Sequence, residues 1–241
     1  TQLASFFPNA KMAGLLMNAE IENAKKVLLH AERPFTAIVG GAKVSDKILI
    51  VENLLNLADH IIIGGGMAYT FFKALGGHIG NSLCETERLD TCLEILNKAK
   101  TKGVQIHLPI DAIAADRFAA DANTQIEPSN AISEDRMGLD IGPKAIADFE
   151  AVLLQSKTIL WNGPMGVFEM PAFENGTKSM ALAVASATKN GAFSLIGGGD
   201  SAAAVQKFEL SSQVSYVSTG GGALLEYFEG KVLPGVEALE A

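Results

Sequence analysis

Residues 34–66 carry the sequence PFTAIVGGAKVSDKILIVENLLNLADHIIIGGG, in which a short apolar run followed by glycines occurs twice. Residues 35–39 and 60–63 have the length and composition of buried strands, and residues 43–57 between them have helical periodicity. A strand, a glycine turn and a helix in this order form the repeating unit of a parallel sheet. These residues therefore predict a fold of the α/β class.

The same unit recurs along the rest of the chain. About six repeats of strand, loop and helix imply a three-layer, Rossmann-like parallel sheet of about six strands with helices on both faces. Residues 109–142 are rich in Asp, Asn, Ser, Pro and Gly, and we expect them to be irregular. The remaining strands are expected at residues 104–108, 158–161, 193–196 and 214–217. The remaining helices are expected at residues 8–30, from residue 67 onwards, at residues 85–102, 143–154, 173–189 and 201–208, and after residue 222.

Composition excludes several classes of protein. Of the 241 residues 48% are hydrophobic and the formal net charge is −8, so the chain can form a large core but is poorly suited to bind nucleic acid over a broad surface. No apolar run approaches the length of a membrane helix. The two cysteines, Cys84 and Cys92, lack a zinc-binding or disulfide pattern, and the first residues lack signal-peptide features, which favours the cytoplasm.

Glycine clusters follow directly on the predicted strands. The carboxyl ends of parallel strands lie at one edge of a sheet, where ligands bind in such folds. We therefore expect this edge to be a surface where the backbone approaches a ligand closely. The clusters are Gly40-Gly41, Gly64-Gly65-Gly66, Gly163, Gly197-Gly198-Gly199 and Gly220-Gly221-Gly222.

The segment Ile196-Gly197-Gly198-Gly199-Asp200-Ser201 is the strongest candidate for a phosphate site. Glycines allow successive backbone N–H groups to face an anion, and the helix expected from Ser201 adds the positive end of its dipole. Asp200 occupies the predicted N-cap position. It either caps the helix or also holds Mg²⁺, which prefers carboxylate oxygen.

Two further segments could complete a nucleotide site. Lys43 and Lys47 are four residues apart in a predicted helix, so both could face one oligophosphate, or they could be solvated surface lysines. In the loop of residues 161–169, Glu169 could accept hydrogen bonds from ribose hydroxyls, while Pro164 and Val167 could contact a base.

A dinucleotide site is a weaker alternative. Gly197, Gly199 and Ala202 fit the pattern G-x-G-x-x-A, but residues 217–220 lack the carboxylate that would bind a ribose. The Walker A pattern G-x-x-x-x-G-K-[ST] is absent. These residues leave open a phosphoryl-transfer enzyme, an NAD-dependent oxidoreductase and a non-enzymic nucleotide-binding module.

Eight motifs occur in the order found in one known family. Together they resemble phosphoglycerate kinase over nearly the whole chain. The resemblance implies reversible phosphoryl transfer between 1,3-bisphosphoglycerate and ADP, which gives 3-phosphoglycerate and ATP in glycolysis. The motifs are GGAKVSDK (40–47), IGGGMA (63–68), LPID (108–111), MGLDIGP (137–143), WNGP (161–164), GGGDS (197–201), STGGG (218–222) and GKVLPGV (230–236).

The resemblance also implies a set of site residues. Lys43, Lys47, Gly198 and Gly199 would be catalytic, and Asp200 would hold Mg²⁺. The contacts with ADP or ATP would be made by Gly41, Ala42, Lys43, Lys47, Gly65, Gly66, Leu83, Gly138, Leu139, Asn162, Pro164, Gly166, Val167, Glu169, Gly198, Gly199, Asp200 and Ser201.

The family's enzyme has two domains of similar size, and the resemblance covers the carboxyl-terminal one. Residues 1–30 would be the interdomain helix region, residues 31–230 the nucleotide-binding domain, and residues 231–241 a tail that returns to a missing amino-terminal domain. That domain would hold 3-phosphoglycerate or 1,3-bisphosphoglycerate. We therefore expect this chain to bind Mg-nucleotide but to be nearly inactive alone, with an exposed apolar face around residues 6–7 and 232–233. The complete enzyme is expected to be a monomer.

Overall fold

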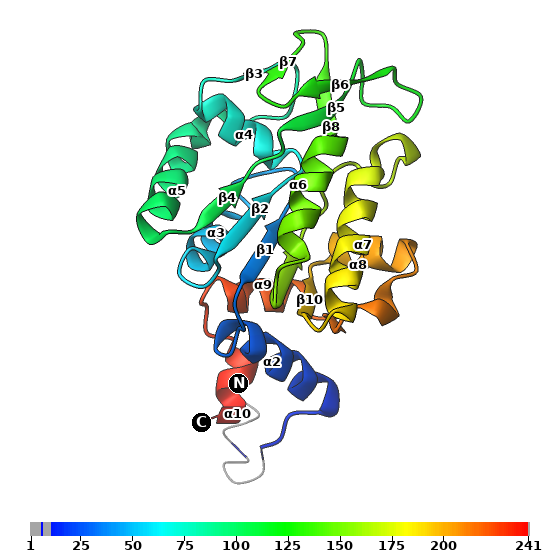
Figure 1. The fold of residues 1–241 in the computed structure, drawn as a ribbon. Helices are drawn as coiled ribbons and strands as arrows, with labels where there is room; N and C mark the ends of the chain where they lie inside the picture. Colours follow the sequence, from blue (N-terminus) through cyan, green and yellow to red (C-terminus); the bar gives the residue numbers. More distant parts are fainter. Residues whose placement is uncertain (1–5, 7–10, 241) are drawn as a thin grey trace.

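A six-stranded parallel sheet forms the centre of the molecule. The computed structural model describes residue 6 and residues 11–240. Its main sheet has the strand order β11-β10-β9-β1-β2-β4, and every neighbouring pair is parallel, which confirms the predicted class (Figure 1). The strands are β1 (Phe35–Val39), β2 (His60–Ile63), β4 (Gln105–His107), β9 (Thr158–Asn162), β10 (Phe193–Gly197) and β11 (Tyr216–Val217).

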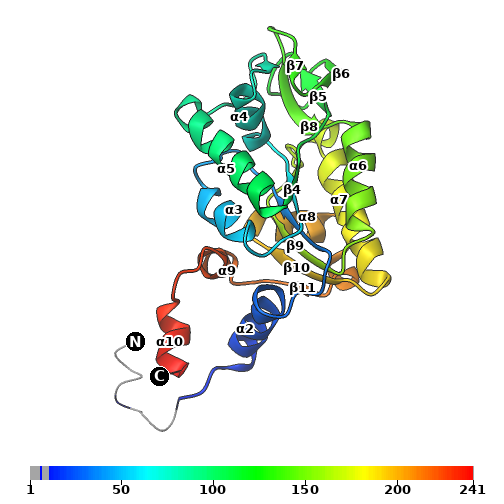
Figure 2. The same cartoon turned by 60° about the vertical axis from the view of Figure 1, so that its left-hand side comes forward.

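Helices cover both faces of this sheet. Helices α3, α4 and α5 lie with α2 and α9 on one face, and α6, α7 and α8 lie on the other (Figures 1 and 2). None of the described helices is long and apolar enough to cross a membrane. The helices are α2 (Leu15–Leu28), α3 (Ile48–Leu54), α4 (Met67–Ala74), α5 (Leu89–Lys102), α6 (Pro143–Leu153), α7 (Asn175–Lys189), α8 (Gly199–Lys207), α9 (Gly221–Phe228) and α10 (Pro234–Glu240), with short 3-10 helices η1 (Thr86–Arg88), η2 (Pro171–Phe173) and η3 (Ser211–Gln213).

The core consists of two layers of apolar side chains, one on each face of the sheet. In β1, Phe35, Ala37 and Val39 face the layer with α3, α4 and α5, whereas Ile38 faces the layer with α6 and α7. Trp161 in β9 is fully buried in the second layer. Because strands buried on both faces are apolar throughout, they stand out as continuous apolar runs in the sequence.

Residues 109–142 are more regular than the sequence predicts. They contribute a three-stranded antiparallel sheet of β5 (Asp111–Ala115), β6 (Thr124–Pro128) and β8 (Met137–Ile141), and also β7 (Ala131–Ile132), which pairs with β3 (His78–Ile79). These short strands contain the polar and turn-forming residues that argued against strands. Pairing between distant strands overrides those local preferences.

The segment before α3 is not helical, contrary to the prediction for residues 43–57. Helix α3 begins at Ile48, and Lys47 precedes it at the N-cap position. The Glu85 carboxylate, forty positions along the chain, accepts hydrogen bonds from the backbone N–H of Ser45 at 3.0 Å and from its hydroxyl at 2.6 Å. Lys43 and Lys47 therefore do not share a helical face.

Two other helices begin elsewhere than predicted. Helix α8 starts at Gly199 after an N-cap at Gly198, so Asp200 lies in the first turn and is not the N-cap. Helix α2 starts at Leu15 with Gly14 as its N-cap, so within the described residues the predicted helix of residues 8–30 begins later than expected. Residues 8–10 lie outside the described residues.

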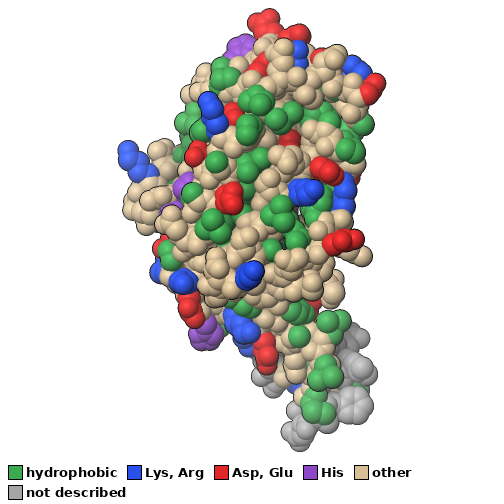
Figure 3. Space-filling view, turned by 45° about the vertical axis from the view of Figure 1, so that its right-hand side comes forward, with side chains coloured by type: hydrophobic (Ala, Val, Ile, Leu, Met, Phe, Trp, Pro, Cys, Tyr) green, Lys and Arg blue, Asp and Glu red, His purple; other side chains and the backbone are tan. Residues whose placement is uncertain are grey.

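One end of the molecule exposes apolar side chains. The side chains of Phe6, Met12, Leu15, Leu16 and Val232 are all more than half exposed, near the start of α2 and before α10. Figure 3 shows hydrophobic side chains at this narrow end. The exposure expected of Phe6 and Val232 is confirmed, whereas Leu233 is half-buried and Phe7 lies outside the described residues. Association through this face stays a prediction.

Candidate functional site

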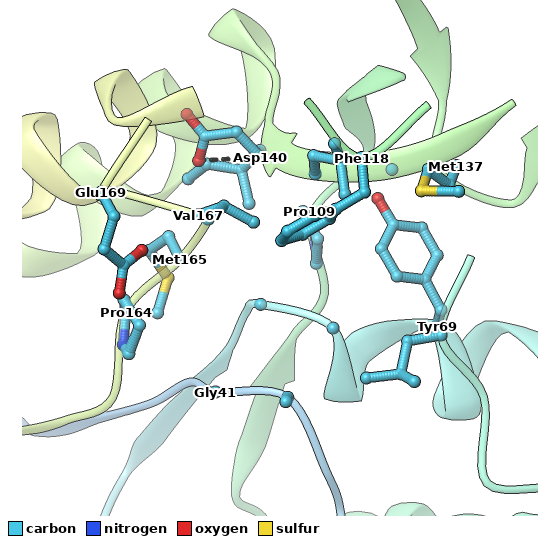
Figure 4. A pocket seen from close by; sticks show the side chains of 18 of the residues that line it. Gly41, Tyr69, Pro109, Phe118, Met137, Asp140, Pro164, Met165, Val167 and Glu169 are labelled. Carbon is cyan, nitrogen blue, oxygen red and sulfur yellow. Dashed lines mark hydrogen bonds between the residues drawn. The ribbon is translucent and has the colours of Figure 1, made fainter. Parts of the chain in front are cut away.

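A pocket of about 470 Å³ lies beyond the carboxyl ends of β1, β2 and β9. The loops after these three strands form one wall, and the small antiparallel sheet forms the opposite wall (Figure 4). Most of the lining is apolar or backbone. The lining residues are Gly41, Ala42, Gly65, Gly66, Tyr69, Asn81, Leu83, Pro109, Phe118, Met137, Gly138, Leu139, Asp140, Ile141, Pro164, Met165, Gly166, Val167, Glu169 and Asp200. We call this cavity the apolar pocket.

The three loops behind the apolar pocket pack backbone against backbone. Gly163 has a φ of 98°, and a side chain on it would overlap the carbonyl oxygen of Gly40. Gly65 has a φ of 69°, and a Cβ there would lie 2.5 Å from the carbonyl oxygen of Gly41. Hydrogen bonds from Gly40 N to Asn162 O and from Gly65 N to Met165 O fix the arrangement. We call Gly40, Gly65 and Gly163 the loop junction.

The loop junction gives these glycines a packing role, and their expected approach to a ligand stays a prediction. Each is required by the neighbouring loop, because a Cβ would overlap main-chain atoms. Two further glycines of the pocket wall are explained in the same way. A side chain on Gly138 would overlap the Tyr69 hydroxyl, and one on Gly166 would overlap the Asp140 carboxylate.

A second group of residues lies at the edge of the pocket, and we call it the polar rim: Lys47, Asn162, Gly198, Gly199 and Asp200. The Lys47 ammonium donates a hydrogen bond to the Asn162 side-chain oxygen, and the Asn162 amide donates to the Gly197 carbonyl at 2.8 Å. Gly198 has a φ of 89°, and a Cβ there would lie 2.5 Å from the Asn162 amide nitrogen. Burial lowers the pKa of Lys47, whereas the negative charge of Asp200 opposes that shift.

The amino terminus of α8 offers unpaired groups to an anion. The N–H groups of Gly199, Asp200 and Ser201 lie in the first turn and have no acceptor within the helix. Within the described residues, the exposed Asp200 carboxylate accepts no hydrogen bond and forms no ion pair within 4.0 Å. A Cβ on Gly199 would meet nothing within 4 Å. The helix dipole therefore favours an anion at this point.

The donors at the polar rim fit one mode of Mg²⁺ binding. Within the described part of the chain, no three His, Cys, Asp or Glu side chains are grouped to hold a metal ion. Mg²⁺ is commonly bound by one or two carboxylates together with the phosphates of a substrate, and it keeps several waters. A free Asp200 carboxylate beside a helix amino terminus fits that mode.

Two predicted site residues have positions that the sequence does not reveal. Ser201 is fully buried, and its hydroxyl oxygen accepts a hydrogen bond from Gly163 N at 2.6 Å, so this side chain supports the loop junction. Lys43 is exposed and lies outside the lining of the apolar pocket. Its positive charge helps to lower the pKa of Glu85, whose carboxylate accepts the two hydrogen bonds from Ser45.

Asp140 is a buried carboxylate in the pocket wall. It accepts hydrogen bonds from Gly176 N at 2.7 Å, at the start of α7, and from Ile141 N at 2.9 Å. Burial raises the pKa of Asp140 to about 7, although these two hydrogen bonds act in the opposite direction. Asp140 thus ties β8 to α7 and fills the space beside Gly166.

The structure divides the residues predicted from the sequence between the two parts of this site. Twelve of them line the apolar pocket: Gly41, Ala42, Gly65, Gly66, Leu83, Gly138, Leu139, Pro164, Gly166, Val167, Glu169 and Asp200. Lys47, Asn162, Gly198 and Gly199 lie with Asp200 in the polar rim, whereas Lys43 and Ser201 lie outside both. Their roles in binding or catalysis stay predictions.

Sequence reasoning missed several residues of the pocket wall: Tyr69, Pro109, Phe118, Met137 and Asp140. Phe118 comes from the segment predicted to be irregular, and nothing in its neighbourhood indicates a pocket. Tyr69 could have been found, because it lies one turn into a helix that begins directly after a strand-end glycine cluster.

The fold and the site define a class of protein. A parallel sheet covered on both faces, with a pocket and a free helix amino terminus at the carboxyl ends of its strands, is the architecture of α/β domains that bind a ligand at this edge.

Comparisons with known proteins give the family. The sequence model of phosphoglycerate kinase matches residues 1–231. The chain is 54% identical to phosphoglycerate kinase of Porphyromonas gingivalis over 239 residues, which are 99% of this chain and 57% of the relative. It is 53% identical to phosphoglycerate kinase of Schistosoma mansoni over 231 residues, 95% of this chain and 56% of the relative. The chain therefore belongs to the phosphoglycerate kinase family.

A solved structure agrees with this assignment. The structure of phosphoglycerate kinase from Coxiella burnetii matches with a TM-score of 0.91 and 46% identity, over 95% of this chain and 58% of that one. The chain thus spans somewhat more than half the length of the relatives that it matches.

Proposed function

We propose that this chain binds ADP or ATP together with Mg²⁺ and forms the nucleotide-binding half of phosphoglycerate kinase. The reaction is the reversible transfer of a phosphoryl group between 1,3-bisphosphoglycerate and ADP, which gives 3-phosphoglycerate and ATP in cytoplasmic glycolysis. One observation carries the proposal: the apolar pocket and the unpaired amino terminus of α8 meet at Asp200. A flat apolar base and a charged phosphate chain require adjacent sites of these two kinds.

The base belongs in the apolar pocket under this proposal. Leu83, Leu139 and Val167 line it and offer apolar surface to both faces of a planar ring. Glu169 is exposed at the pocket mouth, where its carboxylate can accept hydrogen bonds from the ribose hydroxyls. The loop junction fixes the wall formed by the loops after β1, β2 and β9, so little ordering of that wall is needed when the nucleotide binds.

The phosphates belong at the polar rim. The N–H groups of Gly199, Asp200 and Ser201 can donate to phosphate oxygens, and the Asn162 amide and the Lys47 ammonium lie beside them. Mg²⁺ held by Asp200 and the phosphates would neutralise part of the phosphate charge. Lys47 can stabilise the charge that develops on the transferred group, and Lys43 is proposed to do the same from its exposed loop.

The acid substrate would be held outside these 241 residues. The chain has 27 acidic and 19 basic residues, a net charge of −8, which disfavours a phosphorylated acid. The chain covers only 57% of the relative from Porphyromonas gingivalis, which leaves room there for a second substrate site. Residues 1–30 and 231–241 are proposed to connect the nucleotide-binding domain to that part. Transfer requires both reactants in line, and correct orientation contributes about 7–11 kcal/mol to lowering the barrier.

Calorimetry on this chain tests nucleotide binding directly. We expect ADP and ATP to bind with Mg²⁺ present, and NAD to bind much more weakly. Phosphoryl transfer to 3-phosphoglycerate should be nearly absent in a preparation free of longer enzyme. Tight NAD binding without a preference for adenine nucleotides would refute the nucleotide proposal, and rapid transfer by this chain alone would refute a substrate site elsewhere.

The roles of the lysines require an enzyme of full family length. Lys47→Ala and Lys43→Ala, introduced at the matching positions there, should lower kcat more than nucleotide affinity, because a cation aimed at the transferred group acts mainly in the transition state. Lys98→Ala, which removes an exposed lysine paired with Glu52 on the surface, is the matched control and should leave kcat unchanged. If the two variants changed only KM, both lysines would contribute to nucleotide binding and not to the transfer step.

A further inference from the structure

Tyr69 is a buried side chain in the wall of the apolar pocket that the proposed function does not use. It lies in the first turn of α4, only 5% of it is exposed, and its ring packs against Phe72 with centroids 6.2 Å apart. Its hydroxyl fills the space beside Gly138, where a Cβ would overlap it. Burial, together with the nearby Asp140, raises the pKa of Tyr69 well above its usual value, so the hydroxyl stays neutral.

The Tyr69 hydroxyl makes no hydrogen bond within the part of the chain that the structure describes. Its oxygen is not sealed in the core either, because Tyr69 belongs to the lining of the apolar pocket. Because this oxygen is accessible from the pocket, water can bond to it while the pocket is empty, and a bound ligand must replace that hydrogen bond. A ligand in the pocket would supply the missing partner.

The position of this hydroxyl indicates which part of a nucleotide it would meet. In Figure 4, Glu169 and Tyr69 lie at opposite ends of the pocket, with Val167, Pro109 and Phe118 between them. If the ribose lies at Glu169, the base extends from its glycosidic nitrogen N9 towards Tyr69. The edge of a purine opposite N9 carries the substituent at C6. That substituent therefore points to the end of the pocket where the Tyr69 hydroxyl lies.

We propose that the Tyr69 hydroxyl recognises the C6 substituent of a purine base by a hydrogen bond. The proposal rests on the proposed function and adds a specificity residue to it. A hydroxyl can both donate and accept, so it suits the amino group of adenine and equally the carbonyl oxygen of guanine. Tyr69 would thus select nucleotides with a substituted purine, and not adenine in particular.

Binding of two nucleotides to two variants tests this inference. ADP and purine riboside 5′-diphosphate differ only at C6, where the second has no substituent. With Mg²⁺ present, Tyr69→Phe should weaken ADP binding by about two- to tenfold, the range expected for one neutral hydrogen bond. The same substitution should leave the affinity for purine riboside 5′-diphosphate unchanged. Calorimetry gives all four dissociation constants.

Tyr227→Phe is the matched control, because it removes the same hydroxyl from α9, outside the apolar pocket. It should change neither affinity, and circular dichroism should show both variants folded. Equal weakening of both ligands by Tyr69→Phe would mean that Tyr69 acts only as a packing surface and would overturn the inference. Unchanged ADP affinity would overturn it as well. Failure of the unsubstituted chain to bind ADP would instead overturn the proposed function, and this inference with it.

Discussion

The apolar pocket and the polar rim lie side by side but are held in different ways. In the pocket wall and the loop junction behind it, the backbone and side chains are already in contact with one another: Gly163 against Gly40, Gly138 against Tyr69, Gly166 against Asp140. In the rim, Gly199 has open space around it, Asp200 makes no hydrogen bond or ion pair among the described residues, and the first-turn N–H groups of α8 lack acceptors within the helix.

This difference shows which groups need a bound ligand to complete their hydrogen bonds or charge pairing. Apart from the Tyr69 hydroxyl, the groups of the pocket wall described above contact one another, so substitutions of its glycines should act first on the stability of the fold. The rim leaves groups for an anion and a cation to complete, so substitutions there should act on binding and hardly on stability. Four measurements can break or sharpen this contrast.

Gly163→Ala should have the largest effect, and it should act on the fold. Alanine would have to adopt a φ of 98° and overlap the carbonyl oxygen of Gly40. We expect the free energy of unfolding to fall by about 3 kcal/mol or more, because strain and overlap add at this position. Urea titration measures the change, with Gly76→Ala as a control at a positive φ with open space. A loss no larger than that of the control would show that the loops can separate.

The pH dependence of stability should reveal Asp140. Burial raises its pKa from 3.8 to about 7, so between these values the folded state binds more protons than the unfolded state. The free energy of unfolding should therefore fall as pH rises through this window, by about 2 kcal/mol between pH 5 and 7.

Asp140→Asn should remove this slope, whatever it does to the absolute stability. Asp148→Asn, which neutralises an exposed carboxylate on α6, should keep it. An unchanged slope in Asp140→Asn would mean that another group titrates in this range.

Asp200→Asn should act on binding and leave the fold intact. Removing a carboxylate ligand should weaken Mg-ADP binding about tenfold, or about 1.4 kcal/mol, while ADP without Mg²⁺ should bind as before. Calorimetry with and without Mg²⁺ separates the two. Asp46→Asn removes another negative charge near Lys47 and serves as the control. Equal weakening with and without Mg²⁺ would argue against a metal at Asp200.

Gly199→Ala should have the smallest effect on stability. Its Cβ would meet no protein atom within 4 Å, so the free energy of unfolding should change by less than about 0.5 kcal/mol. ADP should nevertheless bind more weakly, since the methyl group lies where phosphate would approach the α8 amino terminus, whereas adenosine should bind unchanged. Loss of adenosine binding would show that the two parts of the site are not separate.

The sequence predicts the sheet better than it predicts the site. The strands of residues 35–39, 60–63 and 158–162 are largely buried on both faces, so each is a mostly apolar run, and glycines follow each of them. A run of this kind predicts a strand from the local sequence alone. The start of α3 cannot be predicted in this way, because Glu85, forty residues further along the chain, fixes the backbone at Ser45.

The pocket wall is hard to predict for a similar reason. Tyr69 and Phe72 are apolar residues at helical spacing, which in a sequence is the pattern of a core helix. Only the arrangement of the small antiparallel sheet opposite α4 makes Tyr69 part of a cavity. Asp140 is likewise an ordinary acidic residue in the sequence, and its burial follows from contacts with the distant Gly166 and Gly176.

The loop junction has a consequence for making chimeras between members of this family. Gly40, Gly65 and Gly163 come from segments separated by up to 123 positions, yet each one fits only against the backbone of another. A crossover point placed between these segments would combine loops from two parent proteins, and the backbones of those loops have not been selected to pack against each other. Exchanging all three loops together should preserve this packing. Recombination libraries should therefore take these three segments from the same parent.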